Sequence, residues 1–213
     1  MSATRLKQPL GVILAGGLAT RMGGGDKALL SLGGRTLLSR VVERIDPQVA
    51  ALALNANGDP ARFAGYGLPV LPDTLPGFPG PLAGVLAGLD WAAEQGADSI
   101  VTVAADTPFF PCDLVPQLLL AAEGRPHLLA LAATPRDGAA LKSGGRVNRH
   151  PTFGLWPVAL RHDLRAALED GLRKVVLWTD GHGAGEALFP VLTFDPFFNV
   201  NTPEDLAQAE ARL

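Results

Sequence analysis

The chain has 213 residues, of which 47 % are hydrophobic and 18 % are charged, and its formal net charge is −3 at pH 7. This length and composition indicate one folded domain and exclude a disordered or fibrous protein. Because the sequence has no run of like charges and no stretch of about 20 apolar residues, neither a nucleic-acid partner nor a membrane span is expected.

Short apolar runs typical of strands alternate with helical patterns along the chain. The strand-like runs are Leu10–Leu14, Val49–Leu54, Ser99–Val103, Leu128–Ala132 and Thr152–Trp156. The helical patterns are Thr36–Ile45, Leu82–Gln95, Asp113–Ala122, Leu164–Leu168, Lys174–Thr179 and Thr202–Leu213. The first and third runs are apolar on both sides, which is typical of central, parallel strands. The alternation predicts one α/β domain over residues 1–213, a Rossmann-like three-layer α/β/α sandwich with a mostly parallel central sheet.

A glycine-rich segment, LAGGLATRMGGGDK, follows the first predicted strand and runs from Leu14 to Lys27. Glycines let backbone N–H groups approach an anion, and Arg21 and Lys27 add two positive charges. A triphosphate needs this combination of amides and cations, so the segment predicts a nucleoside triphosphate site. It contains no P-loop string, and a dinucleotide-type glycine spacing in it begins nine residues after the strand instead of in the strand-to-helix turn.

A carboxylate follows the third predicted strand, in the sequence Ala105-Asp106-Thr107-Pro108. Ligands of open α/β sheets bind at the carboxyl ends of the strands. Mg²⁺ bound to a triphosphate takes only one or two protein carboxylates, so Asp106 alone is chemically sufficient for a metal site. The alternative is that Asp106 caps a turn before Pro108.

These segments together resemble the molybdenum cofactor guanylyltransferase family, within the glycosyltransferase-A-like nucleotidyltransferases. The resemblance extends over nearly the whole chain and is carried by LAGG-x₃-RMGG-x-DK, DTP, GPLAG, RHPT and NVNTPED. Related enzymes that use CTP or sugar phosphates tend to read Leu-Ala-Ala-Gly in the first motif, whereas here Ala15 is followed by Gly16 and Gly17. The resemblance therefore implies a guanine nucleotide.

The resemblance implies transfer of GMP from GTP to the terminal phosphate of molybdopterin carrying molybdenum, which forms molybdopterin guanine dinucleotide and releases pyrophosphate. It implies that Arg21, Lys27 and Asp106 are catalytic and that Asp106 holds Mg²⁺. The nucleotide-binding residues it implies are Leu14, Ala15, Gly16, Gly17, Lys27, Asn55, Asp73, Gly80 and Asp106. On the acceptor side it implies Asn199, Asn201 and Lys174. The partners expected are GTP, molybdopterin, and proteins that deliver the cofactor or accept it.

Several polar residues in these motifs also have a purely structural interpretation. Asn57, which precedes a glycine, is better explained as a turn residue. The GPLAG segment fits a loop joined to a helix by Pro81 equally well. Asn201 fits the cap region of the last predicted helix, next to Thr202, as well as it fits a site. Lys174 fits a solvated helix face as well as an acceptor contact.

No histidine or cysteine is expected to take part in catalysis. A lone loop histidine such as His150 is more often structural, and the other three histidines lack metal-ligand spacing. Cys112 has no partner for a nucleophilic dyad, which favours a buried or capping role. This single cysteine cannot form an intramolecular disulfide, and the first residues lack a signal-peptide pattern, so a cytoplasmic location is predicted.

Two other functions compete with this prediction. One is a CTP-dependent molybdopterin cytidylyltransferase, or a sugar-phosphate nucleotidyltransferase, of the same fold. The other is a non-catalytic nucleotide-binding protein, against which the joint presence of Arg21, Lys27 and Asp106 argues. The segment Arg136–Arg146 is longer and richer in glycine than in compact family members, which leaves recognition of the acceptor open.

Overall fold

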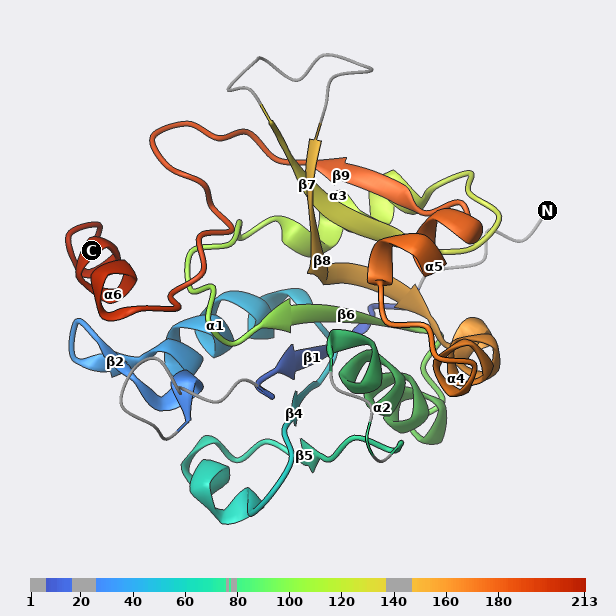
Figure 1. The fold of residues 1–213 in the computed structure, drawn as a ribbon, viewed down its shortest axis with the longest axis horizontal. Coiled ribbons are helices and arrows are strands. Elements are labelled where there is room, and N and C mark those ends of the chain that lie inside the picture. Colours follow the sequence, from blue (N-terminus) through green and yellow to red (C-terminus); the bar gives the residue numbers. More distant parts are fainter. Residues whose placement is uncertain (1–6, 17–25, 76, 78–79, 137–146) are drawn as a thin grey trace.

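The computed structural model describes residues 7–16, 26–75, 77, 80–136 and 147–213. Within these residues a seven-stranded sheet has the strand order β5-β4-β1-β6-β8-β7-β9 (Figure 1). Its strands are β1 (Leu10–Leu14), β4 (Leu52–Asn55), β5 (Val70–Leu71), β6 (Ser99–Ala104), β7 (Ala130–Pro135), β8 (Val147–Pro157) and β9 (Gly185–Leu188). A separate two-stranded hairpin consists of β2 (Ser31–Leu32) and β3 (Arg35–Thr36).

The sheet is mostly parallel, as the sequence predicts. Strands β5, β4, β1 and β6 are parallel neighbours, and β9 is parallel to β7, whereas β8 is antiparallel to both β6 and β7. In this register Leu14 pairs with Asn55 on one side and with Ala104 on the other. Because β1, β4 and β6 end at the same level, the segments that follow them leave the sheet at one edge.

Helices cover both faces of the sheet (Figure 1). They are α1 (Leu37–Ile45), α2 (Pro81–Glu94), α3 (Leu114–Ala122), α4 (Arg161–Glu169), α5 (Val175–Gly181) and α6 (Pro203–Glu210), with short 3-10 helices at Lys27–Leu29, Asp46–Gln48, Pro60–Tyr66 and Val158–Leu160. Neighbouring residues of a strand point to opposite faces. Accordingly Ile13 of β1 packs in one core with α1 and α3, and Val12 packs in a second core with α2, α4 and α5. The three-layer α/β sandwich is confirmed.

The strands that the sequence does not predict are short. Strands β2, β3 and β5 have two residues each and β9 has four, too few for an alternating pattern to stand out. The second predicted strand begins three residues too early, because Val49 is buried but follows a 3-10 helix, and the ladder begins only at Leu52. Strand β8 extends beyond the predicted Thr152–Trp156, over polar residues whose backbone still pairs with β7.

The segment after β9 returns across the molecule to α6, which lies beside β2 and the start of α1 (Figure 1). Val200 and Ala209 are buried there against Leu32 and Leu37. This packing fixes the residues just before α6 next to the edge where β6 ends. Among the described residues, no helix has the length and apolar character needed to cross a membrane.

Candidate active site

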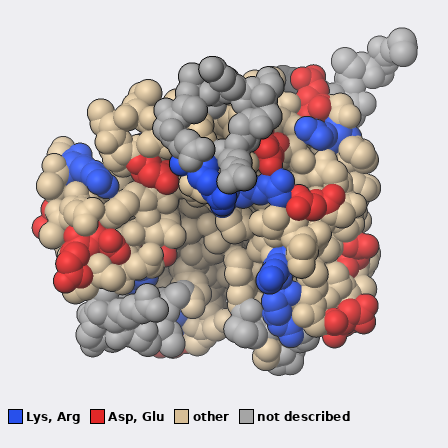
Figure 2. All heavy atoms as spheres, turned by 45° about the horizontal axis from the view of Figure 1, so that its top comes forward, with Lys and Arg blue, Asp and Glu red and all other residues tan. Residues whose placement is uncertain are grey.

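A cleft of about 700 Å³ opens where β1, β4 and β6 end. This volume lies within the range of small-molecule sites. The cleft is lined by Leu14, Gly16, Asn55, Asn57, Asp73, Leu75, Gly77, Gly80, Pro81, Ala104, Asp106, Thr152 and Asn199. Figure 2 shows the surface hollowed in the middle of the view, with basic side chains beside the hollow.

A cation and a carboxylate meet at one end of this cleft. The Nζ of Lys27 donates to Oδ2 of Asp106 over 2.6 Å and also to Oδ1 of Asn201. The two charged side chains are largely shielded, with relative exposures of 11 % for Lys27 and 25 % for Asp106. Partly buried charges are tolerated when they are paired and hydrogen-bonded. The site thus holds a positive charge and several oxygen atoms within a few ångströms.

The backbone holds Asp106 in place on both sides. The N–H of Ala105 donates to the carbonyl of Leu14, which continues the β1–β6 ladder into the turn. The carbonyl of Asp106 accepts from the N–H of Val200 over 2.9 Å. These two backbone hydrogen bonds fix the main chain on both sides of the Asp106 side chain. The second one also holds the segment around Val200 next to Asp106.

A second polar group lies on the β4 side of the cleft. The Nδ2 of Asn55 donates to the carbonyl of Leu71 and to Oδ1 of Asp73, over 3.1 and 3.0 Å. Asn57 exchanges two hydrogen bonds with Asp73, one to Oδ2 at 2.8 Å and one from the backbone N–H at 2.9 Å. The sequence favours a turn role for Asn57. Gly58 does have a positive φ of 85°, but Asn57 also lines the cleft and holds the Asp73 carboxylate.

The first turn of α2 borders the same cleft. Gly80 is the N-cap residue with a φ of 129°, which favours glycine, and Pro81 occupies the first turn. Both residues line the cleft, so the positive end of the helix dipole is close to it. The loop-to-helix interpretation of GPLAG is confirmed, and its role in binding stays a prediction.

Most of the predicted site residues that the structure describes come together here. Leu14 and Gly16 line the cleft, and Ala15 between them is buried and donates its N–H to the carbonyl of Asn55. Lys174 is the exposed N-cap of α5 and is not among the residues that line the cleft. Gly17 and Arg21 lie outside the described residues.

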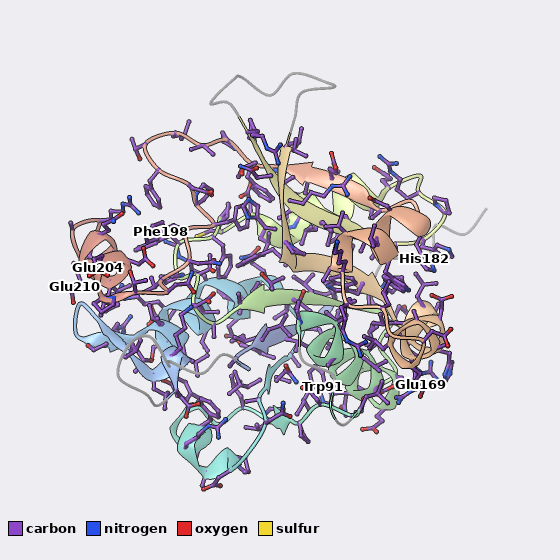
Figure 3. The ribbon with its side chains drawn as sticks, viewed as in Figure 1. Trp91, Glu169, His182, Phe198, Glu204 and Glu210 are labelled. Carbon is purple, nitrogen blue, oxygen red and sulfur yellow. The ribbon has the colours of Figure 1, made fainter. Side chains whose placement is uncertain are left out.

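Asn201 belongs to the cap region of α6 and also contacts a charged residue at the cleft, so both interpretations that the sequence left open remain compatible with its position. Its backbone N–H donates to Asp205, which together with Thr202 forms the capping box of α6. Its side chain accepts from Lys27. Phe198, three residues before Asn201 and labelled in Figure 3, lies near α6. The guanidinium of Arg212 lies 4.7 Å from the centroid of the Phe198 ring. The cap and the packing of α6 thus orient the asparagine.

His150 is half-buried and lies against the same segment. Its ring stacks on Phe197, with centroids 4.2 Å apart, and its Nε2 lies 3.0 Å from Oγ1 of Thr134. Burial lowers the pKa of His150 below its ordinary value of 6.5, and the carboxylate of Asp195 opposes this only in part. The structural interpretation of His150 agrees with this packing. Cys112, in contrast, is exposed and not buried, because it stands in the turn before α3, where Arg44 contacts its sulfur.

The lowered pKa of His150 predicts a pH-dependent stability. As the pH falls below 6.5, the unfolded chain protonates this group before the folded chain does, so the stability present above that pH is lost. His150→Phe keeps a stacking ring but cannot titrate. Between about pH 7 and about pH 5, wild type should lose more unfolding free energy than the variant. Urea unfolding across this range measures the difference, and a pH-independent gap would contradict the prediction.

The sequence is similar to proteins of known family. Residues 11–182 match the model of the MobA-like NTP transferase domain. Three relatives named molybdenum cofactor guanylyltransferase are each 54 % identical to the chain. They come from Bradyrhizobium sp. strain ORS 278 (94 % of this chain and 91 % of that protein), Rhodopseudomonas palustris strain BisB5 (93 % and 91 %) and Cereibacter sphaeroides (95 % and 96 %).

Solved structures whose sequences are less similar to this chain share its fold. Molybdopterin-guanine dinucleotide biosynthesis protein A from Archaeoglobus fulgidus superposes with a TM-score of 0.67 at 23 % identity, over 95 % of this chain and 97 % of that one. A 2-C-methyl-D-erythritol 4-phosphate cytidylyltransferase from Thermus thermophilus gives 0.67 at 24 % identity, over 97 % and 98 %. Since proteins named for guanine and for cytidylyl transfer have this fold, the fold alone does not decide the base.

Proposed function

The chain belongs to the molybdenum cofactor guanylyltransferase family, and from that premise we propose that it transfers GMP from GTP to the terminal phosphate of molybdopterin carrying molybdenum. The observation that supports this in the chain itself is the group formed by Lys27, Asp106 and Asn201 at the end of a nucleotide-sized cleft. Such a group suits a reaction in which negative charge must be bound and neutralised.

The reaction needs positioning more than proton transfer. An oxygen of the molybdopterin phosphate attacks the α-phosphorus of GTP and forms a new P–O bond. The bond from the α-phosphorus to the oxygen that bridges to the β-phosphate breaks, and pyrophosphate leaves with that electron pair. A phosphomonoester is already largely anionic at neutral pH, so the attacking oxygen needs no general base.

The oxygen atoms at this end of the cleft fit a magnesium ion. Asp106 supplies a carboxylate and Asn201 an amide oxygen, which are ligands that Mg²⁺ prefers. In the described part of the chain, no group of three or more His, Cys, Asp or Glu side chains is arranged to hold a metal ion, and Mg²⁺ held mainly by phosphates needs none. We propose that Asp106 holds Mg²⁺, which when bound neutralises charge on the phosphates. Lys27, and Arg21 from the glycine-rich segment, contribute further positive charge.

We propose that Asn55 and Asp73 bind the guanosine part of GTP, with Leu14, Ala15 and Gly16 alongside and with Gly17 of the glycine-rich segment. Amide and carboxylate groups can pair with the N–H groups of guanine and the hydroxyls of ribose. Gly80 lies at the N-terminus of α2, where the positive end of the helix dipole and free backbone N–H groups can bind a phosphate in the cleft. On the acceptor side we keep Asn199, Asn201 and Lys174 as the proposed contacts.

Gly84 of α2 gives a test of this nucleotide-binding side. A Cβ at this position would lie 2.2 Å from Oδ1 of Asn55 and 2.9 Å from Cδ2 of Leu14. Gly84→Ala must therefore displace Asn55 from Asp73, and we expect the Kd for GTP to rise about tenfold. Isothermal titration calorimetry measures this change.

Gly88→Ala, one turn further along α2, is the matched control. Its Cβ would lie 2.8 Å from Val12 and 2.9 Å from Ile100 in the core, and none of these residues lines the cleft. We expect a lower melting temperature and an unchanged Kd for GTP in this variant. An equal loss of GTP affinity in both variants would show that general destabilisation, and not Asn55, is responsible.

The proposed function has a direct test. The purified protein is incubated with Mo-molybdopterin, Mg²⁺ and one of GTP, CTP, ATP or UTP, and the dinucleotide product and pyrophosphate are measured. We expect a guanine dinucleotide and dependence on Mg²⁺. Equal or better use of CTP would overturn the choice of base, and GTP binding without pyrophosphate release would favour a non-catalytic protein.

We also propose that the protein works in the cytoplasm, because its single cysteine is an exposed free thiol, which suits a reducing compartment. A labile cofactor is better protected if one protein hands it directly to the next. Proteins that deliver molybdopterin or receive the dinucleotide product are therefore included in the proposal as partners.

A further inference from the structure

Thr107 connects two polar residues of the cleft that are distant in sequence. Its side chain is fully buried directly after Asp106. The Oγ1 of Thr107 lies 2.5 Å from Oδ1 of Asn199 and 3.0 Å from Oδ1 of Asp106. The backbone bond from Val200 to the carbonyl of Asp106 holds the two segments together at the same place. This threonine is therefore built into the site, although it does not line the cleft.

Hydrogen-bond geometry decides which end of the Asn199 amide faces Thr107. A hydroxyl has a single proton, and a separation of 2.5 Å lies at the short end of the range for O–H···O bonds and below the range for N–H···O bonds. Thr107 therefore donates to the oxygen of Asn199, while its longer contact with Asp106 shares the same proton at most weakly. Asn199 as a whole is exposed, and the oxygen of its amide faces the buried Thr107.

The other end of this amide is then left for the cleft, which Asn199 lines. Within the described part of the chain, the Nδ2 of Asn199 donates to no protein acceptor. An amide nitrogen carries two N–H donors and no acceptor, so it can bind an anionic oxygen but cannot ligate a cation. The neighbouring Asp106 and Lys27 are the residues to which the proposed function assigns the binding of Mg²⁺ and of phosphates.

We propose that Asn199 binds a substrate phosphate oxygen through its Nδ2 and that Thr107 is the positioning residue that holds the amide in this orientation. The inference rests on the proposed function, because both substrates of that reaction carry phosphates at the reacting centre. The phosphate belongs either to GTP or to the acceptor, and separate binding measurements distinguish the two. The inference goes beyond placing Asn199 near the site, since it assigns the residue a donor role and excludes metal ligation by its oxygen.

Asn199→Asp tests the donor role, because it keeps the size of the side chain while replacing both N–H donors with an acidic oxygen. If the phosphate is that of GTP, we expect the Kd for GTP to rise about tenfold or more. If it is that of molybdopterin, the Kd for GTP stays within about twofold and the KM for molybdopterin rises by the larger factor. Asn199→Leu, which removes the donors without adding charge, should change the same parameter in the same direction.

A metal-binding measurement supplies a readout that is independent of turnover. Mn²⁺ is titrated into protein with GTP and followed by electron paramagnetic resonance. If the oxygen of Asn199 ligated the cation, Asn199→Leu would remove a ligand and weaken Mn²⁺ binding to the protein saturated with GTP. Weaker Mn²⁺ binding in Asn199→Leu, or unchanged values for both substrates, would overturn the inference.

Thr107→Val and Thr107→Ser test the positioning role. Valine keeps the volume of the side chain but removes the hydroxyl, so we expect a change of about tenfold in the parameter that Asn199→Asp alters. Serine keeps the hydroxyl and should restore that parameter to within about threefold. A combined Thr107→Val and Asn199→Leu variant should lose less than the product of the single losses, since both remove one interaction.

Thr102→Val is the matched control for the loss of a buried hydroxyl. Thr102 is also fully buried, and its hydroxyl accepts from Nε1 of Trp156 over 2.8 Å, away from the cleft lining. We expect a lower melting temperature and unchanged substrate parameters. Parallel losses in Thr102→Val and Thr107→Val would reduce Thr107 to a structural role and overturn this part of the inference. A failure of the proposed function looks different, because then wild type and the control also form no guanine dinucleotide.

Discussion

Replacing Asp106 by alanine is expected to lower the rate of GMP transfer by about 10³-fold or more while the protein stays folded. The carboxylate is the negative group of the cluster in which Lys27 and Asn201 meet, and it is the ligand we propose for Mg²⁺. Its loss removes that ligand and leaves Lys27 without its paired charge. Pyrophosphate release with saturating GTP and molybdopterin measures the effect, and thermal unfolding checks the fold.

Asp90→Ala is a closely matched control for this variant. The Asp90 carboxylate accepts from Arg165 over 2.6 Å and has a relative exposure of 24 %, against 2.6 Å and 25 % for Asp106. It lies on α2 outside the cleft lining, so we expect near-normal transfer. Activity of Asp106→Ala that survives at saturating magnesium would refute the proposed role of this residue.

Lys27→Met is expected to change two measurements in opposite directions. Transfer should fall by about 10²-fold or more, because a charge that neutralises phosphates is lost while the length of the side chain is nearly kept. In the protein without nucleotide, however, Lys27 engages the oxygens of Asp106 and Asn201 that suit a cation. Removing the ammonium frees these oxygens, so Mn²⁺ binding without GTP should become about tenfold tighter.

Electron paramagnetic resonance with Mn²⁺ and pyrophosphate release together measure the two effects of Lys27→Met. Arg165→Met serves as the control, since it removes the cation of an equally short ion pair outside the cleft. Neither transfer nor Mn²⁺ binding should change in the control. If Lys27→Met instead weakened Mn²⁺ binding in the absence of GTP, Lys27 would not be competing with the metal for these oxygens.

The sequence alone predicts the features of this protein that depend on local order. Apolar runs at Leu10–Leu14 and Ser99–Val103 identify the central strands, and both are central and parallel in the structure. Since parallel strands end at a common edge, the position of Asp106 directly after a strand is enough to place it at that edge. The cap of α6 at Thr202 is likewise a local signal, and it is found as predicted.

Only the tertiary structure decides how residues from distant segments meet. Lys27 and Asn201 are 174 positions apart, and no local pattern indicates that the ammonium of one lies against the amide of the other. The role of Asn57 depends on Asp73 approaching from the next strand, and the need for glycine at position 84 depends on Asn55 lying against α2. These contacts follow from sheet register and from the packing of α2 and α6, which arise from the summed burial of many side chains. The sequence therefore determines which chemical groups stand at the edge of the sheet, whereas the packed fold decides which of them touch and which atoms they present to a substrate.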